Sequence, residues 1–548
     1  MFTQVADPVG GSLALSALVA ALPLITLFVL LGGLRLKAWQ AGLASLVVAL
    51  GVAVFAFGMP AGQALLAASE GAAFGLFPII WIVLTAIWVF KLTELTGYDL
   101  VLRQAFGSLS PDLRIQAIII AFCFGALLEA LAGFGTPVAV TAVMLLAVGL
   151  SPLRAATVTL VANTAPVAFG AIAVPITTLG RITGLDPQAL GAMVGRQTPI
   201  LALFVPLILV LMVDGHRGVR QTWPAALVGG AAFAVAQFVS SNYLAYQTAD
   251  IVAAFAGAIA LVVLLRVWQP AEVVAAEVAP APVRTGGGTV VEEQVAEPLT
   301  AQRTLLAFAP YLVVVVLFTL ASFGPLQAFL DAHSGWKFAW PGLEVLSSTG
   351  KPPSATTFNL NIVNAGGTVL LVSGLITAAI YRLHPRRLVR AFVDVVVQFR
   401  WTILTVVLVL ALAYVMNLSG QTVTLGLALA ATGGFFAFLS PVVGWIGVAV
   451  TGSDTSANSL FGLLQTTAAA RTGISPVLLG AANTSGGVLG KMISPQNIAI
   501  GAAVVGMTGQ ESELFRKVVG WSVGLLLGMA LLVFLQSTPV LGWMVVAP

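Results

Sequence analysis

Charged residues are scarce in this sequence. Asp, Glu, Lys and Arg make up 8% of its 548 residues, whereas 59% are hydrophobic. This balance excludes a soluble globular protein and a disordered chain. It indicates a chain whose solvent is lipid, and the long runs of Leu, Val, Ala and Gly favour transmembrane helices over a barrel.

Cysteine and histidine are nearly absent as well. The single cysteine, Cys123, lies in an apolar run, so the chain has no disulfide framework. The three histidines are scattered, which argues against a metal or haem site. A formal net charge of +4 spread over connecting segments gives no sign of nucleic-acid binding. We therefore expect no metal, no cofactor and no nucleic-acid partner.

The apolar runs predict an all-α polytopic membrane protein. Runs of roughly 16–23 apolar residues are long enough to cross about 30 Å of hydrocarbon as helices. Two other stretches, 132–193 and 441–507, are apolar but broken by Gly, Pro, Asn, Thr and Ser, and such segments persist at membrane depth only when they are buried or line a wet cavity. The predicted spans are 12–34, 38–57, 77–95, 115–131, 194–213, 223–240, 250–268, 304–322, 366–381, 401–418, 422–440 and 518–536.

Residues 269–303 differ in composition from the rest. They contain four prolines, three consecutive glycines and five glutamates. This is typical of a flexible linker. The chain therefore divides into a first transmembrane repeat (1–268), the linker (269–303) and a second transmembrane repeat (304–548).

One polar pattern occurs in both halves. Residues 162–175 read ANTAPVAFGAIAVP, and residues 482–495 read ANTSGGVLGKMISP. A polar, helix-interrupting segment repeated in two halves of an apolar chain is the strongest sequence pointer to the binding site of a transporter. The alternative is a chance match between two segments rich in Ala and Gly. The identities in register are Ala162/Ala482, Asn163/Asn483, Thr164/Thr484, Gly170/Gly490 and Pro175/Pro495.

The basic residues predict the orientation of the chain. Lys37, Arg103, Arg217 and the arginines of 382–400 fall on one side if the N-terminus is outside, and the positive-inside rule makes that side cytoplasmic. The linker is then cytoplasmic too. The first span of the first half and the first span of the second half then cross the membrane in opposite directions. We therefore expect an inverted repeat.

Glycine and proline predict further helix breaks beside this pattern. Gly133 and Gly452 each precede a threonine by three residues, Thr136 and Thr455. Thr136 would cap a helix whose first residue is Pro137, and Asp454 or Thr455 would cap its counterpart. Asn163 and Thr164, before Pro166, would restart another helix. Helices that begin at membrane depth form an anion site from free N–H groups, although ordinary kinks would leave the same pattern.

A few ionisable residues fall at membrane depth, where a charged side chain costs free energy. Desolvation favours the protonated form of Glu129, which suits a proton carrier, but the residue could instead pair with a basic group. Asp454 is a proton or cation site, or a helix cap. Lys491 could bind a carboxylate or extend to the membrane interface. Arg181 is a weaker candidate for the role of Lys491.

The motifs around these residues resemble bacterial L-lactate permeases of the lactate/glycolate permease family. The similar stretches are 129–138 (EALAGFGTPV), 162–170, 452–456 (GSDTS) and 490–497 (GKMISPQN). The resemblance implies proton symport of L-lactate, D-lactate or glycolate across the inner membrane.

A more distant similarity is to the ion-transporter group that includes sodium/dicarboxylate symporters. It implies a mobile domain on a dimeric scaffold, and thus a homodimer, with substrate held at paired Asn-Thr tips. Asn163, Thr164, Asn483 and Thr484 would then line the site. Ala162 and Ala482 depart from that group, which has Ser there, and this departure disfavours sodium coordination.

We therefore predict a secondary transporter and not an enzyme. No Walker A sequence, dinucleotide-binding glycine fingerprint, His-Glu-x-x-His or paired Cys-x-x-Cys motif is present. The alternatives are a sodium-coupled carboxylate or dicarboxylate symporter, a membrane enzyme acting on lipids and a passive channel. Glu129 and Asp454 would carry protons, and the predicted substrate-binding residues are Thr136, Asn163, Thr164, Thr455, Asn483, Thr484, Lys491 and Arg181.

Overall fold

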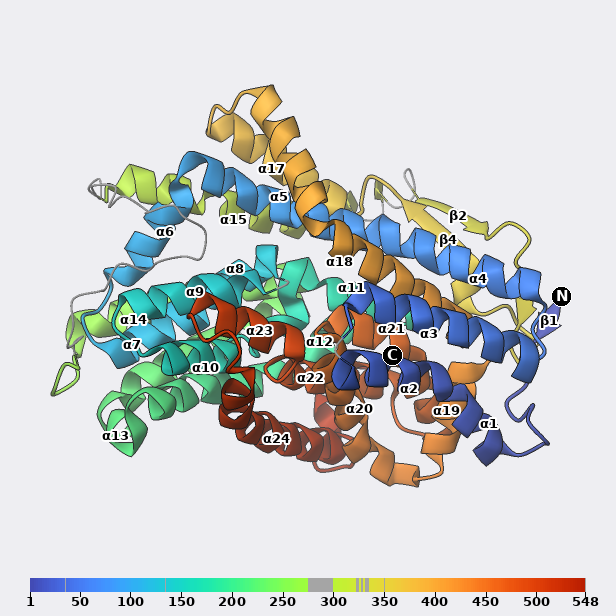
Figure 1. The fold of residues 1–548 in the computed structure, drawn as a ribbon. Helices are drawn as coiled ribbons and strands as arrows, with labels where there is room; N and C mark the ends of the chain where they lie inside the picture. Colours follow the sequence, from blue (N-terminus) through green and yellow to red (C-terminus); the bar gives the residue numbers. More distant parts are fainter. Residues whose placement is uncertain are drawn as a thin grey trace.

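A computed structural model describes residues 1–34, 36–133, 135–274, 299–321, 325–326, 329–330, 335–348 and 350–547. These residues are mostly helical (Figure 1). In this part of the chain, ten helical stretches are long and apolar enough to cross a membrane, or eleven if one bent pair forms a single span. The protein is therefore a polytopic all-α membrane protein, as its composition predicts.

The first half consists of helices, several of which contain π-helical turns. Its α-helices are α1 (Leu13–Ala20), α2 (Leu22–Phe28), α3 (Ala38–Gly51), α4 (Ala61–Phe74), α5 (Trp81–Thr96), α6 (Tyr98–Gly107), α7 (Leu113–Ala117), α8 (Gly125–Ala132), α9 (Thr136–Ala147), α10 (Pro152–Ala162), α11 (Gly170–Thr183), α12 (Pro187–Val194), α13 (Thr198–Tyr243) and α14 (Ala249–Val267). The π-helical segments are η1 (Val29–Gly33), η2 (Val52–Ala56), η3 (Gly75–Ile80) and η4 (Ile118–Phe124), and the short 3-10 helices are η5 (Val167–Phe169) and η6 (Tyr246–Thr248).

The second half adds short strands to its helices, which form two small strand pairs together with one strand at the N-terminus of the chain. The α-helices are α15 (Ala301–Ala321), α17 (Gly366–Ile380), α18 (Pro385–Ser419), α19 (Gln421–Ala430), α20 (Phe436–Thr451), α21 (Asp454–Thr472), α22 (Pro476–Lys491), α23 (Pro495–Val504) and α24 (Glu511–Gln536). The strands are β1 (Phe2–Thr3), β2 (Gly335–Ala339), β3 (Val345–Leu346) and β4 (Thr357–Asn361), and the short 3-10 helices are η7 (Ser354–Thr356), η8 (Gly433–Phe435) and η9 (Gly542–Met544).

Two predicted spans need correction. The span at 422–440 is wrong, because α19 ends at Ala430 and the apolar stretch that could cross a membrane is Gly433–Thr451. Gly433 adopts a φ of 61°, which a helix interior does not accommodate. The span at 77–95 is too short, because the helical stretch begins at Ala61 and only bends where Phe77 leaves the helical region.

The N-terminus and the connection before α17 lie at the same end of the molecule (Figure 1). β1 pairs in parallel with β3, and β2 pairs antiparallel with β4. The terminal amine of Met1 is 3.3 Å from a carboxylate oxygen of Glu344. These two regions, which are far apart in sequence, therefore share one side of the protein.

A buried arginine organises the start of α7. Arg114 is fully buried, donates to both carboxylate oxygens of Asp112 and is 3.1 Å from Asp214. It also donates to the carbonyl of Glu272, which anchors the start of the predicted linker. Burial by itself would raise the pKa of Asp112, but hydrogen bonds from Arg114 and the Val274 N–H outweigh burial and hold that pKa below its usual value. Residues 275–298, most of the predicted linker, lie outside the described residues.

Glycines allow α20 and α22 to pack closely. A Cβ atom on Gly444, Gly486 or Gly490 would collide with backbone atoms of the other helix. Small residues that let two backbones approach are typical of helix packing in membranes. This contact fixes the position of α22, whose last residue is Lys491.

The repeated Asn-Thr pattern adopts two different conformations. In the first half, α10 ends at Ala162, and the helical segment after the break, Val167–Thr183, is bent by 62° relative to α10. In the second half, Asn483 and Thr484 lie inside the continuous helix α22, so the expected helix break at this pair is wrong. Pro166, which has no N–H to donate, favours the first break, whereas no proline follows Asn483 in the second segment until Pro495.

Candidate functional site

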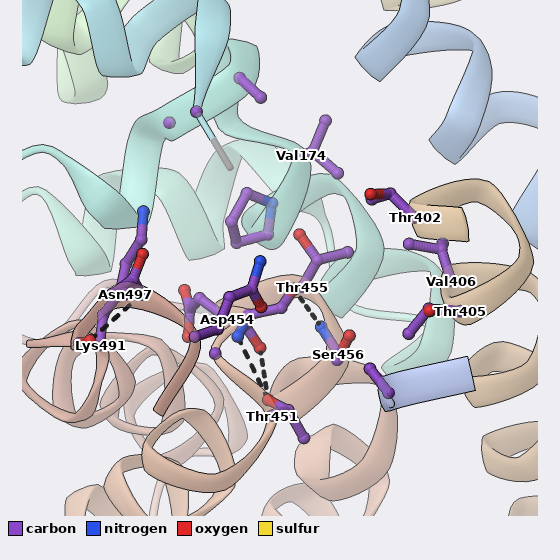
Figure 2. A pocket seen from close by; sticks show the side chains of 18 of the residues that line it. Val174, Thr402, Thr405, Val406, Thr451, Asp454, Thr455, Ser456, Lys491 and Asn497 are labelled. Atoms are coloured by element: carbon purple, nitrogen blue, oxygen red, sulfur yellow. Dashed lines mark hydrogen bonds between the residues drawn. The ribbon is translucent and has the colours of Figure 1, made fainter. Parts of the chain in front are cut away.

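A cavity of about 440 Å³ lies between α18 and α3 on one side and α8, α11, α21 and α23 on the other (Figure 2). The predicted site residues among its lining are Glu129, Asp454, Thr455 and Lys491. The rest of the described lining consists of Lys37, Ala38, Trp39, Gly133, Val167, Gly170, Ala171, Val174, Pro175, Trp401, Thr402, Thr405, Val406, Thr451, Gly452, Ser453, Ser456, Gln496 and Asn497.

Glu129 and Lys491 form an ion pair in the wall of this cavity. The Lys491 Nζ is 2.7 Å from Glu129 Oε1, and their side chains are 8% and 4% exposed. Asn163 Nδ2 donates to the other oxygen, Glu129 Oε2, at 2.9 Å. Glu129 thus pairs with a basic group, and its proton-carrying role stays a prediction. Lys491 is buried and directed to a carboxylate of the protein.

Two glycines leave room for the Glu129 carboxylate. A Cβ on Gly170 would lie 2.7 Å from Oε1, and a Cβ on Gly133 would lie 3.1 Å from the same atom. Gly170 begins α11, and Gly133 ends α8. The glycines that predict helix breaks thus also provide space around the charged pair.

Asp454 is a second buried carboxyl group in the cavity wall. It is 4% exposed, and neither of its oxygens has a hydrogen-bond partner among the described residues. It is the first residue of α21, but the helix is capped by Ser453, whose Oγ accepts from the N–H of Ser456. The expectation that Asp454 or Thr455 caps this helix is therefore wrong.

The beginnings of two helices contribute to the cavity. Thr455 and Ser456 lie in the first turn of α21, and Gln496 and Asn497 lie in the first turn of α23. Helix N-termini carry a partial positive charge that favours anions. Of the helix starts predicted from the Gly and Pro breaks, that of α21 lines the cavity, and the anion site itself stays a prediction.

Thr136 occupies a different position from the one predicted. Gly135 precedes α9 with a φ of 90° and takes the capping position, so Thr136 is the first helical residue instead of its cap. It is not part of the described cavity lining. Glycine is preferred there because the backbone lies in the left-handed region and Ile500 packs where a Cβ would be.

Asn483 and Thr484 belong to a buried amide network. Asn483 donates to Asn458 Oδ1 at 2.8 Å and accepts from Gln465, while Asn458 donates to Thr484 Oγ1 at 2.7 Å. Asn458 also donates to the Pro175 carbonyl of the first half. The pair joins α21 and α22 to the first half and does not line the cavity.

Two further predicted residues lie away from the cavity. Thr164 is buried and donates to the carbonyl of Val161, one turn earlier. Arg181 donates to the carbonyl of Asn359 in β4. Neither is in the described cavity lining, so only Asn163 of the first Asn-Thr pair reaches the ion pair.

Sequence analysis missed Asp250, another buried acid near the first Asn-Thr pair. It is fully buried in the first turn of α14, its Oδ1 accepts from Gln237 Nε2 at 2.9 Å, and its Oδ2 has no partner among the described residues. Gln237 also donates to the Ala165 carbonyl, close to Asn163. The signal that could have found it is an aspartate at the first position of the predicted span 250–268.

Known proteins similar to this chain are carboxylate permeases. The glycolate permease GlcA of Escherichia coli K12 is 42% identical over 99% of both chains. The L-lactate permease of Bacillus subtilis 168 is 40% identical over 99% of this chain and 100% of its own, and that of Salmonella typhimurium LT2 is 40% identical over both full lengths.

Two solved structures are similar at lower levels. The YdaH transporter of Alcanivorax borkumensis has a TM-score of 0.42 and 16% identity over 85% of this chain and 86% of its own. MtrF of Neisseria gonorrhoeae has a TM-score of 0.43 and 14% identity over 86% of this chain and 82% of its own. The family model described as L-lactate permease matches residues 16–540. The chain therefore belongs to the L-lactate permease family.

Proposed function

We propose that this protein is a proton symporter that imports L-lactate, D-lactate and glycolate across the bacterial inner membrane. The names of its relatives support the substrate class. We also propose that 1–268 and 304–548 are inverted repeats around the cavity, with the N-terminus outside and the linker 269–303 cytoplasmic. The pairing of β1 with β3 supports placing the N-terminus and the connection before α17 on the same, outer side.

The ion pair between Glu129 and Lys491 is the observation that carries the proposal. Lys491 is a buried cation, and its charge is balanced by a carboxylate of the protein. A substrate carboxylate is the same chemical group, so it can replace Glu129 at Lys491. For this exchange Glu129 must lose its negative charge, which it does by accepting a proton.

Charge balance then couples the proton to the substrate. At the ion pair, the empty state holds the Lys491 cation and the Glu129 anion, and the loaded state holds the Lys491 cation, the substrate anion and neutral Glu129. The other ionisable groups of the lining, Lys37 and Asp454, keep one charge state throughout this exchange. Substrate without a proton would add an unbalanced buried anion, and a proton without substrate would leave Lys491 unpaired. Each state costs several kcal/mol, so the two ligands bind together, one to one.

Asn163 and the helix N-termini support this exchange. Asn163 holds Glu129 Oε2, so the carboxyl group keeps its orientation after its contact with Lys491 breaks. The first turns of α21 and α23 supply neutral donors and partial positive charge for the incoming carboxylate. The relatives, named for L-lactate and glycolate, give no support to the sodium-coupled alternative.

The test is uptake of labelled L-lactate into sodium-free proteoliposomes that contain the purified protein. With an imposed inward proton gradient, we expect accumulation above equilibrium that collapses when a protonophore is added. Uptake only to equilibrium would indicate a passive pathway. A strict requirement for sodium would restore the sodium-coupled alternative.

A further inference from the structure

The two carboxylate oxygens of Asp454 are buried in the cavity wall and have no partner among the described residues. Buried polar groups are normally hydrogen-bonded, and an unmet acceptor costs free energy. Both oxygens therefore keep unused acceptor capacity, on a residue that lines the cavity. Glu129, in contrast, is fully engaged by Lys491 and Asn163.

Tertiary packing sets the position of this carboxyl group. Its Oδ1 lies against Gly487 of α22, where a Cβ atom would collide with it. Gly487 and Lys491 are four residues apart, on the same face of α22. Asp454 Oδ1 thus lies about one helical turn, ~5.4 Å, from the position on α22 where the Lys491 side chain begins. Figure 2 shows both side chains in the same cavity wall.

The names of the relatives define the group that such a site must bind. L-lactate and glycolate each carry a hydroxyl group on the carbon next to the carboxylate, and they differ only by a methyl group. If Lys491 receives the carboxylate, the neighbouring hydroxyl still needs a partner. The methyl group can face the apolar side chains of Val174 and Val406, which also line the cavity.

We propose that Asp454 binds the 2-hydroxyl group of the substrate and thereby selects 2-hydroxy acids over simple carboxylates. This assignment rests on the proposed function and replaces the expected proton-carrying role of Asp454 with a role in specificity. A site built around a substrate hydroxyl rejects an analogue that lacks it, because the buried group is then left unpaired.

Two pairs of acids that differ only by this hydroxyl provide the test: L-lactate with propionate, and glycolate with acetate. The affinity of the purified protein for each acid is measured as a ligand-dependent thermal shift in detergent, and by competition with labelled L-lactate counterflow in proteoliposomes. In the wild type, we expect each hydroxy acid to bind about 10- to 100-fold more tightly than its partner.

Asp454→Ala should weaken L-lactate and glycolate until they bind like propionate and acetate, whose affinities should not change. Asp454→Asn keeps one acceptor oxygen and should retain part of the discrimination. The matched control is Asp186→Ala, which removes an aspartate at the N-terminus of α12 that only caps its own helix. This control should leave the affinity ratios unchanged.

Several outcomes would overturn the assignment. If the wild type transports L-lactate but binds propionate equally well, the role of Asp454 is overturned and the proposed function stays intact. Equal weakening of all four acids in Asp454→Ala, or lost proton-driven accumulation with unchanged affinity ratios, would also reject it. If Asp454→Ala does not fold, affinity ratios in Asp454→Asn equal to those of the wild type would reject it. A wild type with no L-lactate uptake would overturn the proposed function itself.

Discussion

Glu129 and Lys491 are 362 residues apart in the chain, yet their charged atoms lie 2.7 Å apart in the wall of a central cavity. One belongs to each half of the protein, so the ion pair joins the two halves at the proposed site. Any movement that separates the halves must break or replace this contact. A substrate carboxylate is the natural replacement for Glu129.

Replacing Glu129 by Gln should uncouple transport from the proton. Glutamine has the shape of the protonated carboxyl group, so Lys491 is permanently available to the substrate. We expect labelled L-lactate exchange to persist, while proton-driven accumulation falls to the equilibrium level. Glu94→Gln, which alters an exposed pair with Lys91, should behave like the wild type. Normal accumulation in Glu129→Gln would show that the proton is carried elsewhere.

Removing Lys491 should destabilise the protein by leaving Glu129 without its partner. We expect Lys491→Met to lower the free energy of unfolding by about 3–5 kcal/mol near neutral pH, because a buried charge then lacks compensation. The double variant Glu129→Gln/Lys491→Met should recover most of this loss. Chemical unfolding in detergent measures both values.

Lys91→Met is the control for Lys491→Met, because the exposed pair of Lys91 with Glu94 contributes at most about 1 kcal/mol to the free energy of unfolding. If the double variant were as unstable as the two single changes added together, the ion pair would not couple these residues.

Gly170→Ala should impair transport more than stability. The new Cβ would lie 2.7 Å from Glu129 Oε1, so the carboxylate must move away from Lys491 or Asn163. We expect an L-lactate uptake rate at least about tenfold lower, since displaced functional groups lose efficiency steeply. Gly528→Ala, at an open position of α24, should leave uptake unchanged. Wild-type uptake by Gly170→Ala would mean that the carboxylate has room to shift without loss.

Acid should weaken the contact between Arg114 and Asp112. The pKa of Asp112 is lowered in the folded protein, so the unfolded chain binds this proton more readily. The stabilisation is complete well above the usual aspartate pKa of about 3.9 and is lost as the pH falls through the lower folded value. Asp112→Ala should lower the free energy of unfolding by about 3–5 kcal/mol near neutral pH.

The measurement for Asp112 is the thermal unfolding midpoint in detergent as a function of pH. The difference between the wild type and Asp112→Ala should narrow towards low pH. Glu344→Gln, at an exposed contact with the N-terminal amine, should follow the wild type. A difference that stays constant with pH would exclude Asp112 as the titrating group.

Much of the fold could be predicted from the sequence because the signals are local. The apolar runs predict α14 and the helical stretch Ala38–Ala56, which contains α3, within about one residue of the observed bounds. Gly452 and Pro166 mark real interruptions, since their effects on the backbone do not depend on distant residues. The same reasoning failed at Asn483 and Thr484, whose amide network with Asn458 and Gln465 keeps them inside α22.

The sequence by itself determined that this chain is embedded in a lipid bilayer and that its helices break near Gly133 and Gly452. It also determined that Glu129, Asp454 and Lys491 are ionisable residues at membrane depth, where such residues are rare. Only the tertiary structure decided which charges meet. It paired Lys491 with Glu129, left the buried oxygens of Asp454 without a partner among the described residues and directed Arg181 to the Asn359 carbonyl. The reason is physical: a helix break follows from the local backbone, whereas the partner of a buried charge depends on which helices pack together.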